Sequence, residues 1–112
     1  MEKQGAVLNK ADFEAKFFHA LSDPSRLSIL RLLLDQERSV NDIAAGASMS
    51  QSCVSNHLAC LRNCNFVSVR QEGRKVYYSL RHPEIRSILE IGEKLVRTHA
   101  EELARCTGCM EG

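Results

Sequence analysis

SQSCVSNHLACLRNC at residues 50–64 and FVSVRQEGRKVYYSL at residues 66–80 form the stretch that decides the fold. In the first part, Val54, Leu58 and Leu61 recur at the spacing of one helical face. In the second part, β-branched and aromatic runs lie on either side of residues 71–74, which is typical of a two-stranded hairpin. The stretch therefore predicts a helix at about residues 50–63, followed directly by a hairpin.

Three helices are predicted before this stretch. The first starts at about residue 12, and Asp23 and Pro24 have the cap and first-turn chemistry that starts the second. Its predicted core-facing residues are Leu27, Leu30, Leu33 and Leu34. Ser39 or Asn41 is expected to cap a short third helix, which Gly46 ends through its tolerance of positive φ. A tight turn at residues 47–49 then leads into the helix at residues 50–63.

A last helix is predicted after the hairpin, beginning at Pro83 and keeping an apolar stripe for about five turns. The chain has 112 residues, which suits one domain spanning residues 1–112. Residues 1 to about 10 are expected to be a flexible tail, and about 104–112 a cysteine-containing tail. No apolar run approaches the ~20 residues of a membrane span, and no secretory signal is present. We expect a cytoplasmic protein.

Two short helices, a tight turn and a hairpin with a basic tip make the outline of a winged helix-turn-helix, a mainly α fold with a small β-hairpin wing. In such a pair the second helix enters the major groove of DNA, and its N-terminal residues contact base edges. The expected contacts to bases or phosphates are Gln51, Ser52, Ser55 and Asn56. The expected phosphate or minor-groove contacts are Arg62, Arg70, Arg74 and Lys75. A solvated polar helix face is the alternative interpretation, and a formal net charge of only +1 makes local charge placement decisive.

Five cysteines in a reducing compartment favour thiolate chemistry over disulfides. Cys60 and Cys64 are one helical turn apart, a spacing at which two side chains can hold one ion. Soft thiolates favour Cd(II), Pb(II) or Zn(II), and Arg62 is expected to assist thiolate formation. Cys106 and Cys109 can supply the further ligands, from the other subunit if the last helix lies at a dimer interface. The alternative is that the cysteines pack as small hydrophobic residues, which we favour for Cys53.

Three segments together resemble the ArsR/SmtB family of metal-responsive repressors: ALSDPSRLSIL at residues 20–30, QSCVSNHL at 51–58 and EGRKVYY at 72–78. The resemblance implies a homodimer built on the first and last helices, which binds operator DNA and is released by an inducer. It places DNA contacts at Gln51, Ser52, Ser55, Asn56 and Arg74. Residues 55–64 are most similar to the cadmium- and lead-sensing, CmtR-like branch, in which a cysteine of the C-terminal tail completes the site. Cys106 lies nearest that tail position, and Cys109 is an addition to the pattern.

The expected function is thus a repressor, not an enzyme, with Cd(II) or Pb(II), or Zn(II), as inducer. An As(III)- or Sb(III)-responsive repressor on the same fold is one alternative, because trivalent arsenic also takes three thiolates. A redox or persulfide switch is another, in which Cys106 and Cys109 oxidise to a disulfide. A thiol oxidoreductase using the same two cysteines is disfavoured, because the sequence lacks the βαβ context of that motif.

Overall fold

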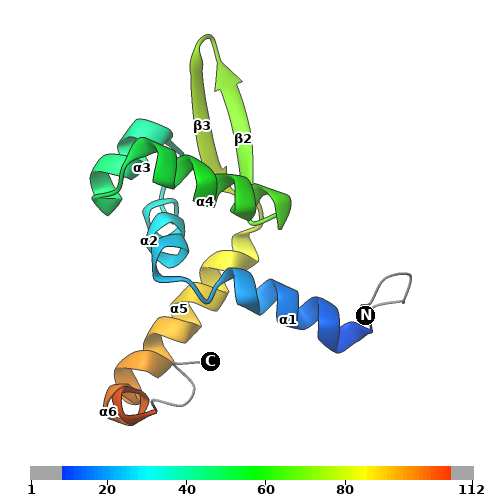
Figure 1. Ribbon diagram of the computed structural model, residues 1–112, viewed down its shortest axis with the longest axis vertical. Helices are drawn as coiled ribbons and strands as arrows, with labels where there is room; N and C mark the ends of the chain where they lie inside the picture. The colour runs from blue at the N-terminus through cyan, green and yellow to red at the C-terminus, as the bar shows by residue number, and fades with distance from the viewer. Residues whose placement is uncertain (1–8, 107–112) are drawn as a thin grey trace. The chain divides into compact units, whose positions relative to one another are not determined.

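The computed structural model describes residues 9–106 and divides into two compact units, Met1–Arg81 and His82–Gly112. The first unit carries four helices and a small sheet among its described residues (Figure 1). Its elements are α1 (Lys10–Ala20), α2 (Pro24–Leu32), β1 (Arg38–Ser39), α3 (Val40–Ala47), α4 (Gln51–Asn63), β2 (Val67–Glu72) and β3 (Lys75–Leu80). This is the predicted mainly α, winged helix-turn-helix architecture.

Each helix of the first unit begins at a side chain that accepts a hydrogen bond from a free backbone N–H of the first turn. Asn9 caps α1, and Asp23 caps α2 with Pro24 as its first residue. Ser39 caps α3 in a capping box with Asp42, and Ser50 caps α4. Of the two caps expected for α3, Ser39 is therefore the correct one.

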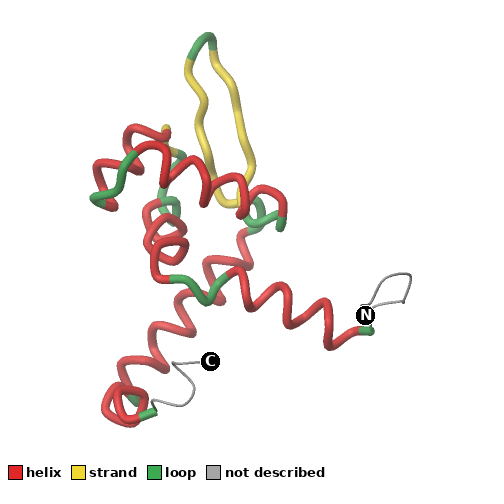
Figure 2. The backbone as a smooth tube through the Cα atoms, viewed as in Figure 1, coloured by secondary structure: helices red, strands yellow, loops and turns green. Residues whose placement is uncertain are grey.

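The sheet is antiparallel with the strand order β1–β3–β2. Strands β2 and β3 pair from Val67 with Leu80 to Glu72 with Lys75, and they form the predicted hairpin, joined by a short loop at its tip (Figure 2). The added strand β1 pairs Arg38 with Tyr78. The prediction of a two-stranded hairpin did not include β1. A strand of two residues is too short to leave a recognisable pattern in the sequence.

The core of the first unit joins all of its helices to the base of the hairpin. Its buried residues are Ala20, Ile29, Leu30, Leu33, Ile43, Val54, Leu58, Leu61, Phe66 and Val67. Phe17 of α1 stacks against Phe66 with ring centroids 4.9 Å apart. On α2 the prediction was partly wrong, because Ile29 is fully buried while Leu27 and Leu34 are half-buried. The stripe predicted for α4 is buried throughout.

The end of α3 differs from the expectation. Gly46 lies inside the helix, and Ser48 takes the left-handed conformation at its end, with φ 57° and ψ 48°. A Cβ at Gly46 would lie 3.0 Å from both Cδ atoms of Leu32. The glycine thus allows the end of α2 to approach α3 closely, and it does not end the helix.

The second unit contains α5 (Pro83–Thr98) and α6 (Ala100–Arg105), separated at His99. The prediction of one continuous helix was therefore wrong at this residue, whose backbone has φ −118° and ψ 28°. Ile85 and Leu89 are buried, whereas the large apolar residues exposed in this unit are Ile91, Leu95, Val96 and Leu103. Within residues 9–106, no helix has the length and apolar character needed to cross a membrane.

Candidate nucleic-acid interface and cysteine pocket

Helices α3 and α4 form a helix-turn-helix whose turn is fixed by local hydrogen bonds. Met49 donates its backbone N–H to the carbonyl of Ala44 at 3.0 Å, and the Ser50 hydroxyl accepts from the N–H of Cys53 at 3.1 Å. A side-chain hydrogen bond also joins the two helices, since Gln51 Nε2 donates to Asn41 Oδ1. The start of α4 is therefore held by both its cap and its neighbour.

The outer face of α4 carries the polar residues singled out by the sequence. All four of them are exposed: Gln51, Ser52, Ser55 and Asn56. The opposite face is buried through Val54, Leu58 and Leu61. Because short hydroxyl and amide groups both donate and accept hydrogen bonds, this face is suited to base edges and phosphate oxygens. Arg62 is exposed in the last turn of the same helix.

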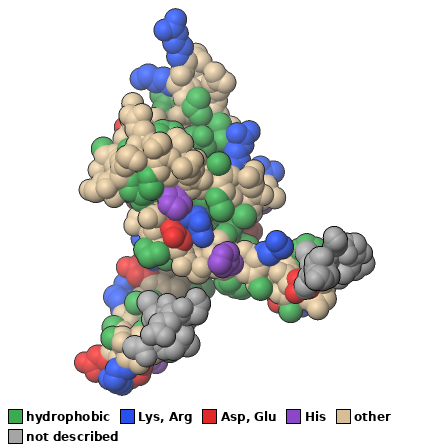
Figure 3. All heavy atoms as spheres, in the orientation of Figure 1, with side chains coloured by type: hydrophobic (Ala, Val, Ile, Leu, Met, Phe, Trp, Pro, Cys, Tyr) green, Lys and Arg blue, Asp and Glu red, His purple; other side chains and the backbone are tan. Residues whose placement is uncertain are grey.

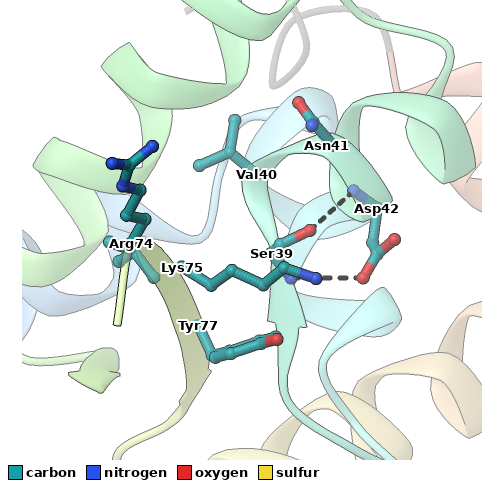
Figure 4. Close-up of a pocket in the computed structure, with 8 residues that line it drawn as sticks. Ser39, Val40, Asn41, Asp42, Arg74, Lys75 and Tyr77 are labelled. Atoms are coloured by element: carbon teal, nitrogen blue, oxygen red, sulfur yellow. Dashed lines mark hydrogen bonds between the residues drawn. The ribbon is translucent and has the colours of Figure 1, made fainter. Parts of the chain in front are cut away.

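Arg74 and Lys75 follow Gly73, which has φ +64°, at the tip of the hairpin. Figure 3 shows basic side chains, in blue, at the top of the view. Arg74 and Lys75 line a groove of about 440 Å³ between the hairpin and the first turn of α3. Figure 4 shows Ser39, Asn41 and Asp42 on the α3 side of this groove and Arg74, Lys75 and Tyr77 on the hairpin side. The exposed cations of the tip are available to contact a polyanion.

Arg70, unlike the cations of the tip, is hydrogen-bonded to two carboxylates. Its Nε donates to Glu37 Oε1 at 3.0 Å, its Nη1 donates to Glu72 Oε1 at 3.0 Å, and its guanidinium carbon lies 4.9 Å from the centre of the Tyr77 ring. The hydrogen bond from Arg70 lowers the pKa of Glu37, and the two carboxylates raise the pKa of Arg70. Arg70 thus ties the hairpin to the segment before β1.

Cys60 and Cys64 line a cavity of about 530 Å³ on the inner side of α4. Residues from α1 and α2 complete the lining: Ala15, Lys16, His19, Ala20 and Arg26. The two thiols are near enough to interact, since Cys60 raises the pKa of Cys64. A pair of adjacent thiols facing a cavity suits a soft metal ion. Within residues 9–106, however, no three His, Cys, Asp or Glu side chains are gathered to hold a metal, so a further ligand would have to join the pair.

The remaining cysteines differ in their surroundings. The sulfur of Cys53 contacts Met49 Sδ at 3.8 Å beside the turn between α3 and α4. Cys106 is half-buried at the end of α6, in the second unit, and Cys109 lies outside the described residues. The structure therefore brings together Cys60 and Cys64 among the predicted metal ligands. Whether the tail cysteines join them stays a prediction.

The pKa of the Cys64 thiol is raised above its ordinary value, first by desolvation and then by the neighbouring Cys60. The charges of Arg26 and Lys16 act in the opposite direction. The cations that act on Cys64 thus come from α2 and α1, and the expectation that Arg62 assists thiolate formation stays a prediction. Arg26 and Lys16 are distant from Cys64 in the sequence, and no spacing rule predicts that they line the same pocket.

This raised pKa predicts slow alkylation of Cys64. Because a thiol whose pKa lies above the working pH is mostly protonated, the rate with iodoacetamide should rise about tenfold per pH unit between pH 7 and 8. Cys60→Ser should increase the rate at pH 8 about twofold, since it removes the neighbouring thiol that raises the pKa. Site-resolved mass spectrometry measures the rates, with Cys53→Ser as control. A rate that levels off below pH 8 would contradict the raised pKa.

Comparison with known proteins supports a regulatory role. Residues 23–69 match the family described as bacterial regulatory protein, arsR family. The chain is 38% identical to a probable mercury resistance operon repressor of Streptomyces lividans over 96 residues, which cover 86% of this chain and 77% of the relative. It is 48% identical over 73 residues to a transcriptional repressor SmtB homolog of Synechocystis sp., covering 65% and 55%. It is 46% identical over 66 residues to the transcriptional regulator CmtR of Mycobacterium tuberculosis, covering 59% and 56%.

Solved structures confirm the fold. The crystal structure of M. tuberculosis Rv0081 has a TM-score of 0.77 at 29% identity and covers 87% of this chain and 99% of its own. The homodimeric winged helix-turn-helix DNA-binding domain of Mycobacterium bovis Mb0332 has a TM-score of 0.73 at 27% identity, with 84% and 92% covered.

Proposed function

Because this chain belongs to the ArsR family of bacterial regulatory proteins, we propose that it is a cytoplasmic transcriptional repressor that binds operator DNA and is released by a soft metal ion. The polar face of α4 enters the major groove in this proposal, and the tip of the hairpin contacts the phosphate backbone. No catalytic step is required, because the metal acts as a ligand.

The observation that carries the proposal is the position of the Cys60–Cys64 pair. Cys60 lies in the second half of the 13-residue helix whose first half presents Gln51 and Ser52, and Cys64 is the C-cap of that helix. A metal held by this pair therefore acts on the element proposed to contact the operator. Release then requires only that the metal binds more tightly to a state with lower DNA affinity.

The proposed ligands are Cys60 and Cys64, completed by Cys106 and Cys109 of the tail. Thiolates favour soft or borderline ions, so Cd(II) and Pb(II) are the proposed inducers and Zn(II) is a further candidate. The name of the Streptomyces lividans relative adds Hg(II) to the ions that should be tested. A bound ion would neutralise adjacent thiolates and fix the distance between α4 and the tail.

A homodimer is proposed as the DNA-binding form. Large apolar side chains are exposed in both units, and they include Phe13 and Phe18 of α1 as well as Leu95 and Val96 of α5. A second copy that covers these side chains would gain free energy from their burial. Two copies would also present two α4 helices to a pseudo-palindromic operator.

Titration of the anaerobically reduced protein tests the proposal. Cd(II), Pb(II), Zn(II), Hg(II) and As(III) are added separately, while thiolate-to-metal absorption and release of labelled upstream DNA are followed together. Binding of Cd(II) or Pb(II) with loss of DNA supports the proposal. Release by As(III) alone favours an arsenic-responsive repressor, and release by persulfide or peroxide without metal favours a redox switch.

The hairpin predicts unequal roles for its arginines in DNA binding. Arg74→Gln should lower the affinity for DNA about threefold to tenfold and reduce the slope of log K against log salt by about 1, because one phosphate contact is lost. Arg70→Gln should change the slope less, since Arg70 already pairs with Glu37 and Glu72. Fluorescence anisotropy at several salt concentrations measures both slopes. An equal loss of slope in the two variants would contradict this assignment.

A further inference from the structure

Cys60 and Cys64 are neighbouring thiols at the end of α4. The backbone N–H of Cys64 donates to the carbonyl of Cys60 at 3.0 Å, so the two residues are one helical turn apart. At this spacing the Cβ atoms of two residues are about 5–6 Å from each other. Neither side chain belongs to the buried core, since Cys60 is half-buried and Cys64 is exposed. A ligand that bonds to two sulfurs can therefore reach both thiols.

The cavity beside these thiols is larger than one ion requires. This cavity, the cysteine pocket, is lined by Cys60, Cys64 and residues of α1 and α2. Its volume of about 530 Å³ falls in the range of about 300–1,000 Å³ that is typical of pockets for small organic ligands. Ala15 and Ala20 contribute methyl groups to the lining, and none of the described lining residues is an aspartate or a glutamate. The pocket can therefore hold an organic group in addition to an atom bonded to the sulfurs.

A monosubstituted trivalent arsenical meets both conditions. When an arsenic(III) oxide R–As=O reacts with two thiols, two As–S bonds form while the As=O bond and both S–H bonds break. The oxygen leaves as water with the two thiol protons, arsenic stays trivalent, and the organic group R stays bonded to it. The reaction consumes no oxidant or reductant, and the neutral product needs no third protein ligand. Neither inorganic As(III) nor a divalent ion brings an organic group that could occupy the cavity.

We propose that the cysteine pocket binds a trivalent organoarsenical through As–S bonds to Cys60 and Cys64, with the organic group of the ligand in the cavity. All of the described lining comes from α1, α2 and the end of α4, which belong to the first unit. The site therefore requires no cysteine of the tail. The inference rests on the proposed function for the coupling between the pocket and DNA, and it deepens that function by naming a class of inducer.

The lining also favours an aromatic organic group over a methyl group. A phenyl ring removes more apolar surface from water than a methyl group does when it enters the pocket. Lys16 and Arg26 line the same pocket, and cations are attracted to the face of an aromatic ring. We therefore expect phenylarsine oxide to bind more tightly than methylarsine oxide, by about tenfold.

Phenylarsine oxide is the probe in the test of the two bonds. The anaerobically reduced full chain is titrated with it, adducts are counted by intact-mass spectrometry, and affinity is measured by competition with a small dithiol. Cys60→Ser and Cys64→Ser should each lower the affinity about a hundredfold or more, because the second As–S bond forms within an already bound complex. The double variant Cys106→Ser/Cys109→Ser should bind as tightly as wild type.

A second comparison tests whether the cavity holds the organic group. Ala15→Leu places a larger side chain in the lining, and Ala11→Leu is the matched control, because Ala11 is exposed on the same helix and is not among the residues that line the pocket. Ala15→Leu should lower the affinity for phenylarsine oxide about tenfold, since overpacking a filled site is unfavourable. The affinity for methylarsine oxide should change less than about twofold, since a methyl group leaves most of the pocket empty. Ala11→Leu should alter neither affinity.

Two results would overturn the inference: unchanged affinity for phenylarsine oxide in Cys60→Ser and Cys64→Ser, or an equal effect of Ala15→Leu on both arsenicals. Release of labelled DNA by phenylarsine oxide and by Cd(II) is measured in parallel samples. Release by Cd(II) from a wild-type protein that does not bind phenylarsine oxide would refute the inference and leave the proposed function intact. Binding of phenylarsine oxide without release of DNA by either ligand would instead refute the proposed function.

Discussion

Cys60→Ser or Cys64→Ser is expected to abolish metal-triggered release of DNA while leaving the DNA affinity of the metal-free protein within about twofold of wild type. Serine nearly preserves the size of the side chain, and neither cysteine belongs to the buried core. A serine hydroxyl is a poor ligand for soft ions. Loss of either thiolate should therefore remove the whole coupling between metal binding and DNA binding. In allosteric proteins such coupling typically changes an affinity by about 5- to 150-fold.

Fluorescence anisotropy of labelled operator-region DNA, with and without Cd(II), measures this coupling. Cys53→Ser is the matched control, because Cys53 lies on the same helix but its sulfur packs on Met49 of the preceding turn and is not part of the cysteine pocket. Cys106→Ser and Cys109→Ser, tested singly and together, identify the tail ligand. A Cys60→Ser or Cys64→Ser protein that still releases DNA when metal is added would refute the proposed mechanism.

The sequence predicted the helices and the hairpin well because their signals are local. Asp23 and Pro24 start α2, and β-branched and aromatic runs define β2 and β3. The errors arose where contacts between residues distant in the sequence determine the local structure. Gly46 has no Cβ and so allows the Leu32 side chain to approach α3 closely. The short strand β1 is formed by its pairing with β3. Neither contact leaves a pattern in the residues around it.

In the candidate site, too, local spacing predicted one part and tertiary contacts determine the other. Cys60 lies in the last turns of α4 and Cys64 is its C-cap, so helical spacing was sufficient to place them side by side. The basic lining was missed because Lys16 and Arg26 come from other helices, and their contact with the thiols depends on how α1 and α2 pack on α4. Arg62 is closer to Cys64 in sequence than either, yet it is not among the charges that affect the pKa of Cys64.

Gln51→Ala is expected to lower the affinity for specific operator DNA about tenfold or more, because a well-formed amide contact to a base is worth about 1–3 kcal/mol. Gln51 is exposed at the first residue of α4, and its hydrogen bond to Asn41 restricts the orientation of its amide. An amide that is already oriented loses less conformational freedom when it binds a base. Asn41→Ala should therefore weaken specific binding in the same direction, by about twofold to fivefold, although Asn41 itself need not contact a base.

Specific and non-specific DNA must be compared in the same buffer to establish this role. Gln51→Ala should leave non-specific affinity and its salt dependence unchanged, since phosphate contacts dominate both. Asn63→Ala, at the other end of α4, is the matched control and should alter neither. Thermal melting checks that each variant is folded. If Gln51→Ala weakens specific and non-specific binding by the same factor, Gln51 acts on the backbone of the DNA, and sequence selectivity must come from other residues of α4.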